Sequence, residues 1–98
     1  MRRVVDAEGV HLAAILHAAD FEAQRVLEVG SGDGRLTRGI AATASSVFAF
    51  DPKAADIRSA RSTCPSDLRE KVRFEVASAA EIEVEPQSVD LVFFSWSL

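Results

Sequence analysis

The chain has little cysteine, no tyrosine and no long apolar run. Among its 98 residues Cys64 is the only cysteine. A single cysteine excludes an intramolecular disulfide, so the cytoplasm is the expected compartment. No stretch approaches the roughly 18 consecutive apolar residues of a membrane span. The pair Arg2-Arg3 is followed by acidic residues and not by an apolar segment, so we expect neither a signal peptide nor membrane insertion.

The chain also lacks an excess of positive charge. Eleven basic residues stand against 15 acidic ones, which gives a net charge of −4 and an isoelectric point near 5.1. This balance argues against a nucleic-acid partner or an anionic membrane surface. His11 and His17 are six residues apart and do not form the H-x-x-x-H pair of a metal site, so no metal is expected. The length allows one domain with a modest core.

Apolar patterning predicts helices and strands in alternation. Apolar residues three and four apart predict an amphipathic helix, whereas short continuous or alternating apolar runs predict strands. The expected order is helix 8–19, strand 26–29, helix 35–44, strand 47–50, helix 51–62, strand 72–76, a loop over most of 77–88, and strand 89–95. At the start of the third helix we expect Asp51 as the cap and Pro52 in the first turn. The alternation implies an α/β fold with a parallel sheet and right-handed crossovers.

The segment 26–34 reads Val-Leu-Glu-Val-Gly-Ser-Gly-Asp-Gly and holds three of the five glycines. Glycine permits a positive φ and lets a ligand approach the main chain without a Cβ in the way. A buried strand that breaks into such a turn and then opens a helix is typical of nucleotide sites in α/β folds.

The spacing of these glycines distinguishes between ligand classes. A dinucleotide fingerprint is G-x-G-x-x-G, but here the third glycine comes one residue early and position 35 is arginine. Asp51 ends the predicted second strand about twenty residues later, where a carboxylate accepts hydrogen bonds from ribose hydroxyls. The pattern disfavours a dinucleotide. A nicotinamide-dependent oxidoreductase stays as the second enzymatic alternative.

Four segments together resemble class I S-adenosylmethionine-dependent methyltransferases. Residues 26–34 resemble motif I of that family, and residues 48–51 (Phe-Ala-Phe-Asp) resemble its acidic second-strand motif. Residues 72–82 and 88–92 resemble the third strand with its adenine-contacting loop and the start of the fourth strand. The resemblance implies a Rossmann-like parallel sheet with flanking helices, in strand order 3-2-1-4 and truncated after the fourth strand. Residues 1–98 would then form a partial methyltransferase domain, its cofactor-binding half.

The resemblance also implies an S-adenosylmethionine site. Its members are Glu28, Gly30, Ser31, Gly32, Asp51, Pro52, Ser78, Ala79 and Ser95. The glycine-turn backbone would face the methionine and ribose part, Asp51 the ribose diol, and Pro52 the adenine. Glu28 would orient the turn or reach the cofactor's ammonium group, and Ser95 would close the site near the methionine. A buried Glu28 without ligand contact is the alternative for that residue.

The loop after the third predicted strand departs from the family at one position. The Ala79 amide would face the adenine edge, and the family often has aspartate where this chain has Ser78. Serine accepts a hydrogen bond without charge, so we expect weaker adenine binding. Methyl transfer from a sulfonium needs mainly positioning of donor and acceptor, and we assign no catalytic residue.

The predicted fourth strand is hydrophobic and lies close to residue 98. As an edge strand it would leave Phe93, Phe94 and Trp96 poorly covered, which favours self-association or pairing with a partner. We therefore expect S-adenosylmethionine-dependent methyl transfer to an unidentified acceptor, with this chain supplying the cofactor-binding half. The alternative of another class is a non-catalytic, truncated or interaction module that keeps the fold.

Overall fold

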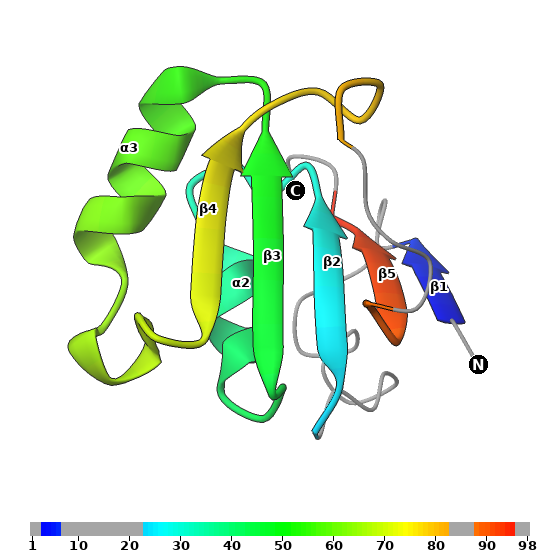
Figure 1. Ribbon diagram of the computed structural model, residues 1–98. Coiled ribbons are helices and arrows are strands. Elements are labelled where there is room, and N and C mark those ends of the chain that lie inside the picture. Colours follow the sequence, from blue (N-terminus) through cyan, green and yellow to red (C-terminus); the bar gives the residue numbers. More distant parts are fainter. Residues whose placement is uncertain (1–2, 7–22, 83–87, 96–98) are drawn as a thin grey trace.

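A parallel β-sheet forms the centre of the computed structural model, which describes residues 3–6, 23–82 and 88–95. Its strands are β1 (Arg3–Asp6), β2 (Arg25–Val29), β3 (Ser46–Asp51), β4 (Val72–Val76) and β5 (Leu91–Phe94). The strand order is β1-β5-β2-β3-β4, and every neighbouring pair is parallel (Figure 1). The four strands predicted from the sequence therefore occur in the expected order 3-2-1-4.

The fourth predicted strand, β5, is not an edge strand, and that expectation was wrong. Residues Arg3–Asp6 form the additional strand β1, which pairs with β5 in register from Arg3 opposite Leu91 to Asp6 opposite Phe94. Phe93 has no exposed surface. Among the described strands, the sheet edges are instead β1 and β4. A segment with only two apolar residues between charged ones gives little strand signal, and β1 is defined by its pairing with β5.

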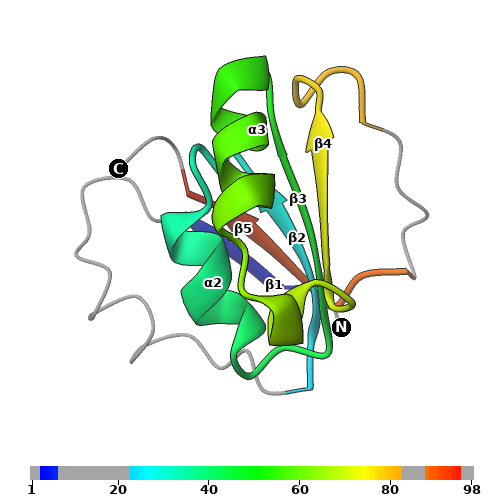
Figure 2. The ribbon, with the colours of Figure 1, turned by 90° about the vertical axis from the view of Figure 1, so that its left-hand side faces the viewer.

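Two helices and a short 3-10 turn complete the described elements. They are α2 (Arg35–Ala41), α3 (Ala54–Thr63) and η1 (Ser66–Leu68). Figure 2 shows α2 and α3 lying side by side on one face of the sheet. The core beneath them has thirteen buried members: Val26, Leu36, Ile40, Ala41, Ala44, Val47, Ala49, Ile57, Ala60, Cys64, Phe74, Leu91 and Phe93.

A second, smaller apolar cluster contains side chains that alternate with those of the main core along the strands. Its buried members are Leu27, Val29 and Phe50, with half-buried neighbours such as Phe48 and Phe94. The helix predicted at 8–19 and the side chain of Trp96 lie outside the described residues. Within the described ranges, no helix is long and apolar enough to cross a bilayer.

The beginning of α3 differs from the sequence expectation. The N-cap residue is Lys53, not Asp51, and the helix begins at Ala54. Asp51 still belongs to the sheet, because its carbonyl accepts a hydrogen bond of 3.1 Å from the Ala77 amide. Its carboxylate accepts from the Lys53 amide at 2.9 Å and so guides the chain toward the helix.

The amino-terminal ends of β2 and β5 are joined by an ion pair. Arg25 donates from Nε and Nη2 to the two carboxylate oxygens of Asp90, each at 3.0 Å, and its backbone amide donates at 2.9 Å. These hydrogen bonds lower the pKa of Asp90 to about 2. The bidentate geometry fixes the register of two strands that are more than 60 residues apart in sequence.

The free edge of β4 is partly covered by a side chain of α3. The Val47 amide donates to the Lys71 carbonyl and the Ala77 amide donates to the Asp51 carbonyl. In a parallel ladder this register turns the Phe74 backbone groups toward the free edge. Arg61 Nη2 donates to the Phe74 carbonyl at 2.6 Å, so a charged side chain occupies an acceptor that would otherwise be open to another strand.

Candidate functional site: the glycine turn

The glycine turn follows the carboxyl end of β2, which lies between β3 and β5 (Figure 1). The chain leaves β2 toward β3 on one side and returns as β5 on the other. Such a reversal of strand order is the topological switch point, where open α/β sheets form a ligand crevice. The fold therefore places residues 30–34 where a ligand site is expected.

All three glycines of the turn have positive φ angles. The values are 78° for Gly30, 57° for Gly32 and 87° for Gly34. The amides of Gly30 and Ser31 both donate to the Phe50 carbonyl, at 2.9 and 3.0 Å, which fixes the turn on the end of β3. Residues with a side chain rarely adopt such positive φ angles, so the path of the backbone favours glycine at all three positions.

Gly32 and Gly34 have different surroundings. A Cβ on Gly34 would lie 3.0 Å from the Cβ of Ala60 and 3.5 Å from the ring of Phe74. A Cβ on Gly32 would meet no atom within 4 Å among the described surroundings. Gly34 therefore serves close packing against α3, whereas Gly32 borders open space into which a ligand could approach.

Asp51 connects the glycine turn to the end of β3. One carboxylate oxygen accepts a hydrogen bond from the Gly32 amide at 3.0 Å, and the other accepts from the Lys53 amide at 2.9 Å. The residue is only 4% exposed. Each carboxylate oxygen can accept a second hydrogen bond, so the group is oriented by the backbone and keeps acceptor capacity.

Glu28 is fully buried beneath the turn and is held by side chains from two other elements. Thr37 of α2 donates to one carboxyl oxygen, Oε1, and Ser95 Oγ lies 2.8 Å from the other, Oε2. Ser95 Oγ also lies 2.9 Å from the Gly30 carbonyl. A hydroxyl has one proton, so it cannot donate to the carboxylate and the carbonyl together. A protonated Glu28 resolves this, because it donates to Ser95, which donates to Gly30.

Burial raises the pKa of Glu28 to about 7, and the nearby negative charge of Asp51 contributes to the increase. When Glu28 is ionised it accepts hydrogen bonds from Thr37 and Ser95, and these oppose the increase in pKa. Desolvation dominates because a carboxylate with no exposed surface loses its hydration. Glu28 is therefore neutral in a substantial fraction of molecules near pH 7.

Thr37 was not among the residues singled out from the sequence. It lies in the first turns of α2, has no exposed surface and faces Glu28. A buried hydroxyl on a helix nine residues after a buried acid gives only a weak sequence signal. Its partner becomes apparent once α2 packs over the end of β2.

The hydroxyl of Ser31 is buried and has no hydrogen-bond partner within the described part of the molecule. Leaving a buried hydroxyl unsatisfied costs about 1–3 kcal/mol. Such a group in a turn at a switch point is consistent with a ligand that supplies the missing partner. A cofactor that fits this turn should therefore supply a hydrogen-bond partner for the Ser31 hydroxyl.

The remaining sequence-derived residues lie in the segments that follow β3 and β4. Pro52 and Ala79 are exposed, and Ser78 is partly exposed. The Ser78 amide donates to Glu81 Oε1 at 2.8 Å, and this hydrogen bond lowers the pKa of Glu81. The Glu81 carboxylate thus lies beside Ser78, the neutral residue at the position where the resembled family often has an aspartate.

Within the described ranges, no group of three or more His, Cys, Asp or Glu side chains is arranged to hold a metal ion.

Residues 26–98 match the family described as a methyltransferase domain. This match covers most of the chain, and the chain belongs to that family. Its fold is the class I fold of S-adenosylmethionine-dependent methyltransferases. A search among functionally curated proteins finds no match.

Solved structures with the same fold come from several organisms. The YcgJ protein of Bacillus subtilis shares 23% identity with a TM-score of 0.75, over 85% of this chain and 36% of that one. Phosphoethanolamine N-methyltransferase 1 of Haemonchus contortus, in complex with phosphoethanolamine and S-adenosylhomocysteine, shares 25% identity with a TM-score of 0.74, over 85% and 18%. An S-adenosylmethionine-dependent methyltransferase of Mesorhizobium loti shares 22% identity with a TM-score of 0.74, over 89% and 40%. The chain thus spans less than half the length of each.

Substitution of Gly32 and of Gly34 should lower the free energy of unfolding by different amounts. We expect Gly34→Ala to destabilise the fold by roughly 2–4 kcal/mol, because a strained φ is combined with a clash against Ala60. Gly32→Ala should cost only about 1–2 kcal/mol for the strained φ. Urea unfolding followed by circular dichroism measures both variants. Equal losses would contradict the proposed packing of Gly34 on α3.

The raised pKa of the buried Glu28 should make the stability of the fold depend on pH. The pKa of Glu28 is higher in the folded state than its unfolded value of 4.5, so the folded chain binds the proton more tightly. The free energy of unfolding should therefore fall between pH 4.5 and pH 7, by on the order of 3 kcal/mol, and then level off. Glu28→Gln keeps the size of the side chain and should remove this decrease. An unchanged pH profile in the variant would assign the effect to other groups.

Proposed function

We propose that this chain binds S-adenosylmethionine at the glycine turn and supplies the cofactor-binding half of a methyltransferase. The observation that carries the proposal is the Asp51 carboxylate fixed on the Gly32 amide at 3.0 Å. It sets an anionic acceptor for ribose hydroxyls beside a backbone that a ligand can approach closely. The family and the class I fold support the same cofactor.

The turn fits the cofactor on three counts. Gly32 borders open space, Asp51 keeps unused acceptor positions, and the Ser31 hydroxyl lacks a partner among the described groups. In the proposed complex the backbone of Gly30, Ser31 and Gly32 lies along the methionine and ribose part. Asp51 accepts from the ribose diol, and a polar atom of the cofactor completes the hydrogen bonding of Ser31.

The loop residues are proposed to surround the adenine. Pro52 flanks the ring, the Ala79 amide meets its edge, and Ser78 accepts from its amino group. Glu81 contributes through its hydrogen bond to the Ser78 amide. This hydrogen bond holds the loop and adds negative potential where the serine itself carries no charge.

Glu28 and Ser95 are proposed to position the turn from beneath it. Both are buried and hydrogen-bonded to each other, and Ser95 also lies within hydrogen-bond distance of the Gly30 carbonyl. In this role they support the backbone that meets the methionine part. The bound cofactor supplies a methyl group on a sulfonium, which is a good leaving group, so the contribution of this chain is binding and orientation.

The solved structures matched by this chain are more than twice as long. We therefore expect the 98-residue chain alone to bind S-adenosylmethionine weakly and to turn over little.

Titration calorimetry with S-adenosylmethionine tests the role of Asp51. Asparagine has one acceptor oxygen where Asp51 uses two, so Asp51→Asn should weaken binding by about tenfold or more through the lost charged hydrogen bonds. Asp33→Asn is the matched control on the same turn. Asparagine can keep the hydrogen bond that Asp33 accepts from the Arg35 amide at 3.2 Å. It loses only the exposed ion pair with the Arg35 side chain at 3.6 Å, which contributes little. Binding that is tight and unaffected by Asp51→Asn would contradict the assignment.

Gly32→Ala tests whether the open side of the turn receives the ligand. The added methyl meets no atom in the free protein, so most of the fold's stability should remain. It would occupy space proposed for the cofactor, and binding should drop by about tenfold or more, as expected when a few contacts are lost. Thermal melting verifies the fold.

Two further results would overturn the proposal in favour of its alternatives. Preferential binding of NAD in a competition titration would favour a nicotinamide-dependent oxidoreductase. Concentration-dependent association in light scattering without any cofactor binding would favour a non-catalytic module that retains the fold.

A further inference from the structure

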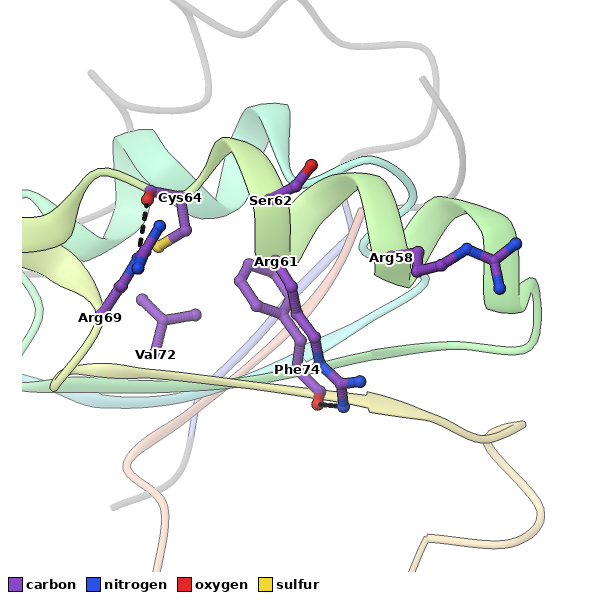
Figure 3. Close-up of a pocket in the computed structure, with 7 residues that line it drawn as sticks. All are labelled: Arg58, Arg61, Ser62, Cys64, Arg69, Val72 and Phe74. Atoms are coloured by element: carbon purple, nitrogen blue, oxygen red, sulfur yellow. Dashed lines mark hydrogen bonds between the residues drawn. The ribbon is translucent and has the colours of Figure 1, made fainter.

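A cavity of about 450 Å³ lies between α3 with the residue that follows it, the end of η1, and strand β4. Its lining residues are Arg58, Arg61, Ser62, Cys64, Arg69, Val72 and Phe74 (Figure 3). The volume is within the range of small-molecule sites. None of these residues belongs to the glycine turn or to the loop at 77–82, so the cavity is separate from the proposed cofactor site.

The lining is strongly cationic. It contains three arginines and no acidic residue. Arg61 approaches Glu75 at 3.9 Å, with both side chains partly exposed, and a pair of this kind is weak. Among the described residues, Arg58 and Arg69 form no ion pair. The cavity therefore carries positive charge that the surrounding protein largely leaves uncompensated, in a chain whose net charge is negative.

Two of the guanidinium groups are held in place and still have donors available. Arg61 uses Nη2 on the Phe74 carbonyl at 2.6 Å, and Arg69 uses Nε on the Cys64 carbonyl at 3.3 Å. A guanidinium has five N–H donors, so most of them stay free. In Figure 3 these two side chains lie on either side of Val72 and Phe74, while Arg58 points away along α3.

The floor of the cavity is apolar. Phe74 and Cys64 are buried, and Val72 is half-buried and packs against the main core. An apolar floor beneath a cationic rim matches a ligand with an apolar body and an anionic group. Guanidinium groups bind phosphate oxygens in bidentate geometry, which favours phosphate as the anionic group.

We propose that this cavity binds a small organic phosphomonoester. Its apolar part covers Val72 and Phe74, and its phosphate pairs with Arg69, which forms no ion pair among the described residues. Arg61, on the other side of this apolar surface, contributes positive potential. Arg58, at the rim, adds to the positive potential without a direct contact.

Phenyl phosphate is a suitable probe because it joins a phosphate to a small apolar ring. Calorimetry should detect binding to the 98-residue chain, with inorganic phosphate weaker by about tenfold because it lacks the apolar contact. Benzyl alcohol, which lacks the phosphate, should not bind. Equal affinity for phenyl phosphate and inorganic phosphate, or no binding of phenyl phosphate, would overturn the proposal.

Matched variants test the named arginines. Arg69→Gln should weaken phenyl phosphate binding by about tenfold, as expected for a lost charge-assisted pair. Arg61→Gln removes only a nearby positive charge and should weaken binding by about threefold. Arg73→Gln removes the same charge from β4, but Arg73 lies over the Phe48 ring at 5.0 Å and does not line the cavity. It should change the affinity by less than about twofold. An equal loss in all three variants would indicate nonspecific attraction and contradict the site.

A second readout keeps the test independent of folding defects in the variants. Cys64 lines the cavity and is the only cysteine, so its alkylation by iodoacetamide reports on this place alone. Phenyl phosphate should slow alkylation of the unaltered chain several-fold, whereas S-adenosylmethionine should not. Unchanged alkylation at saturating phenyl phosphate would place any binding elsewhere. Loss of S-adenosylmethionine binding would leave this result intact, so the two proposals can fail separately.

Discussion

A buried carboxyl group joins the three elements that meet beneath the glycine turn. Glu28 belongs to β2, Thr37 to α2 and Ser95 follows β5, and hydrogen bonds connect all three. Ser95 extends the connection to the Gly30 carbonyl. The direction in which the chain leaves β2 is therefore tied to the helix that follows the turn and to the strand that ends beside it.

Burial of Glu28 lowers the stability of the fold, but its hydrogen bonds favour one arrangement of the packed elements. Taking a carboxylate out of water is unfavourable, which is why the pKa of Glu28 is raised to about 7. A neutral, fully hydrogen-bonded acid avoids much of that penalty. An apolar side chain at this position could not link α2 to β5, and polar links of this kind favour one arrangement of packed elements over others. The nearby negative charge of Asp51 adds to the stabilisation of the neutral state of Glu28.

Much of the fold was predictable from local patterns, and the parts that were not depend on distant partners. The apolar run at 26–29 and the alternation at 72–76 correspond to β2 and β4, because burial on two faces or one face imposes those patterns directly. Strand β1 was missed because its definition depends on β5, almost 90 residues away. The start of α3 was misplaced for a similar reason, since Asp51 stays in the sheet through its pairing with Val76 and the hydrogen bond from the Ala77 amide.

The residues of the candidate site also fall into two groups: those that local sequence patterns predict, and those that depend on distant partners. The glycines and Asp51 could be identified because their spacing reflects backbone geometry that any ligand-binding turn of this kind requires. Thr37 could not, because it meets Glu28 only when α2 packs over the end of β2. The arginine-lined cavity could not either, because it forms only when α3 and β4 are packed together. Phe74 shows how closely these parts are connected. Its carbonyl accepts from Arg61 at the cavity, while its ring occupies space next to Gly34 in the turn. A side chain on Gly34 would therefore disturb the strand that forms the cavity floor. The glycine at this position serves the packing of α3 and β4 as much as it serves the turn itself.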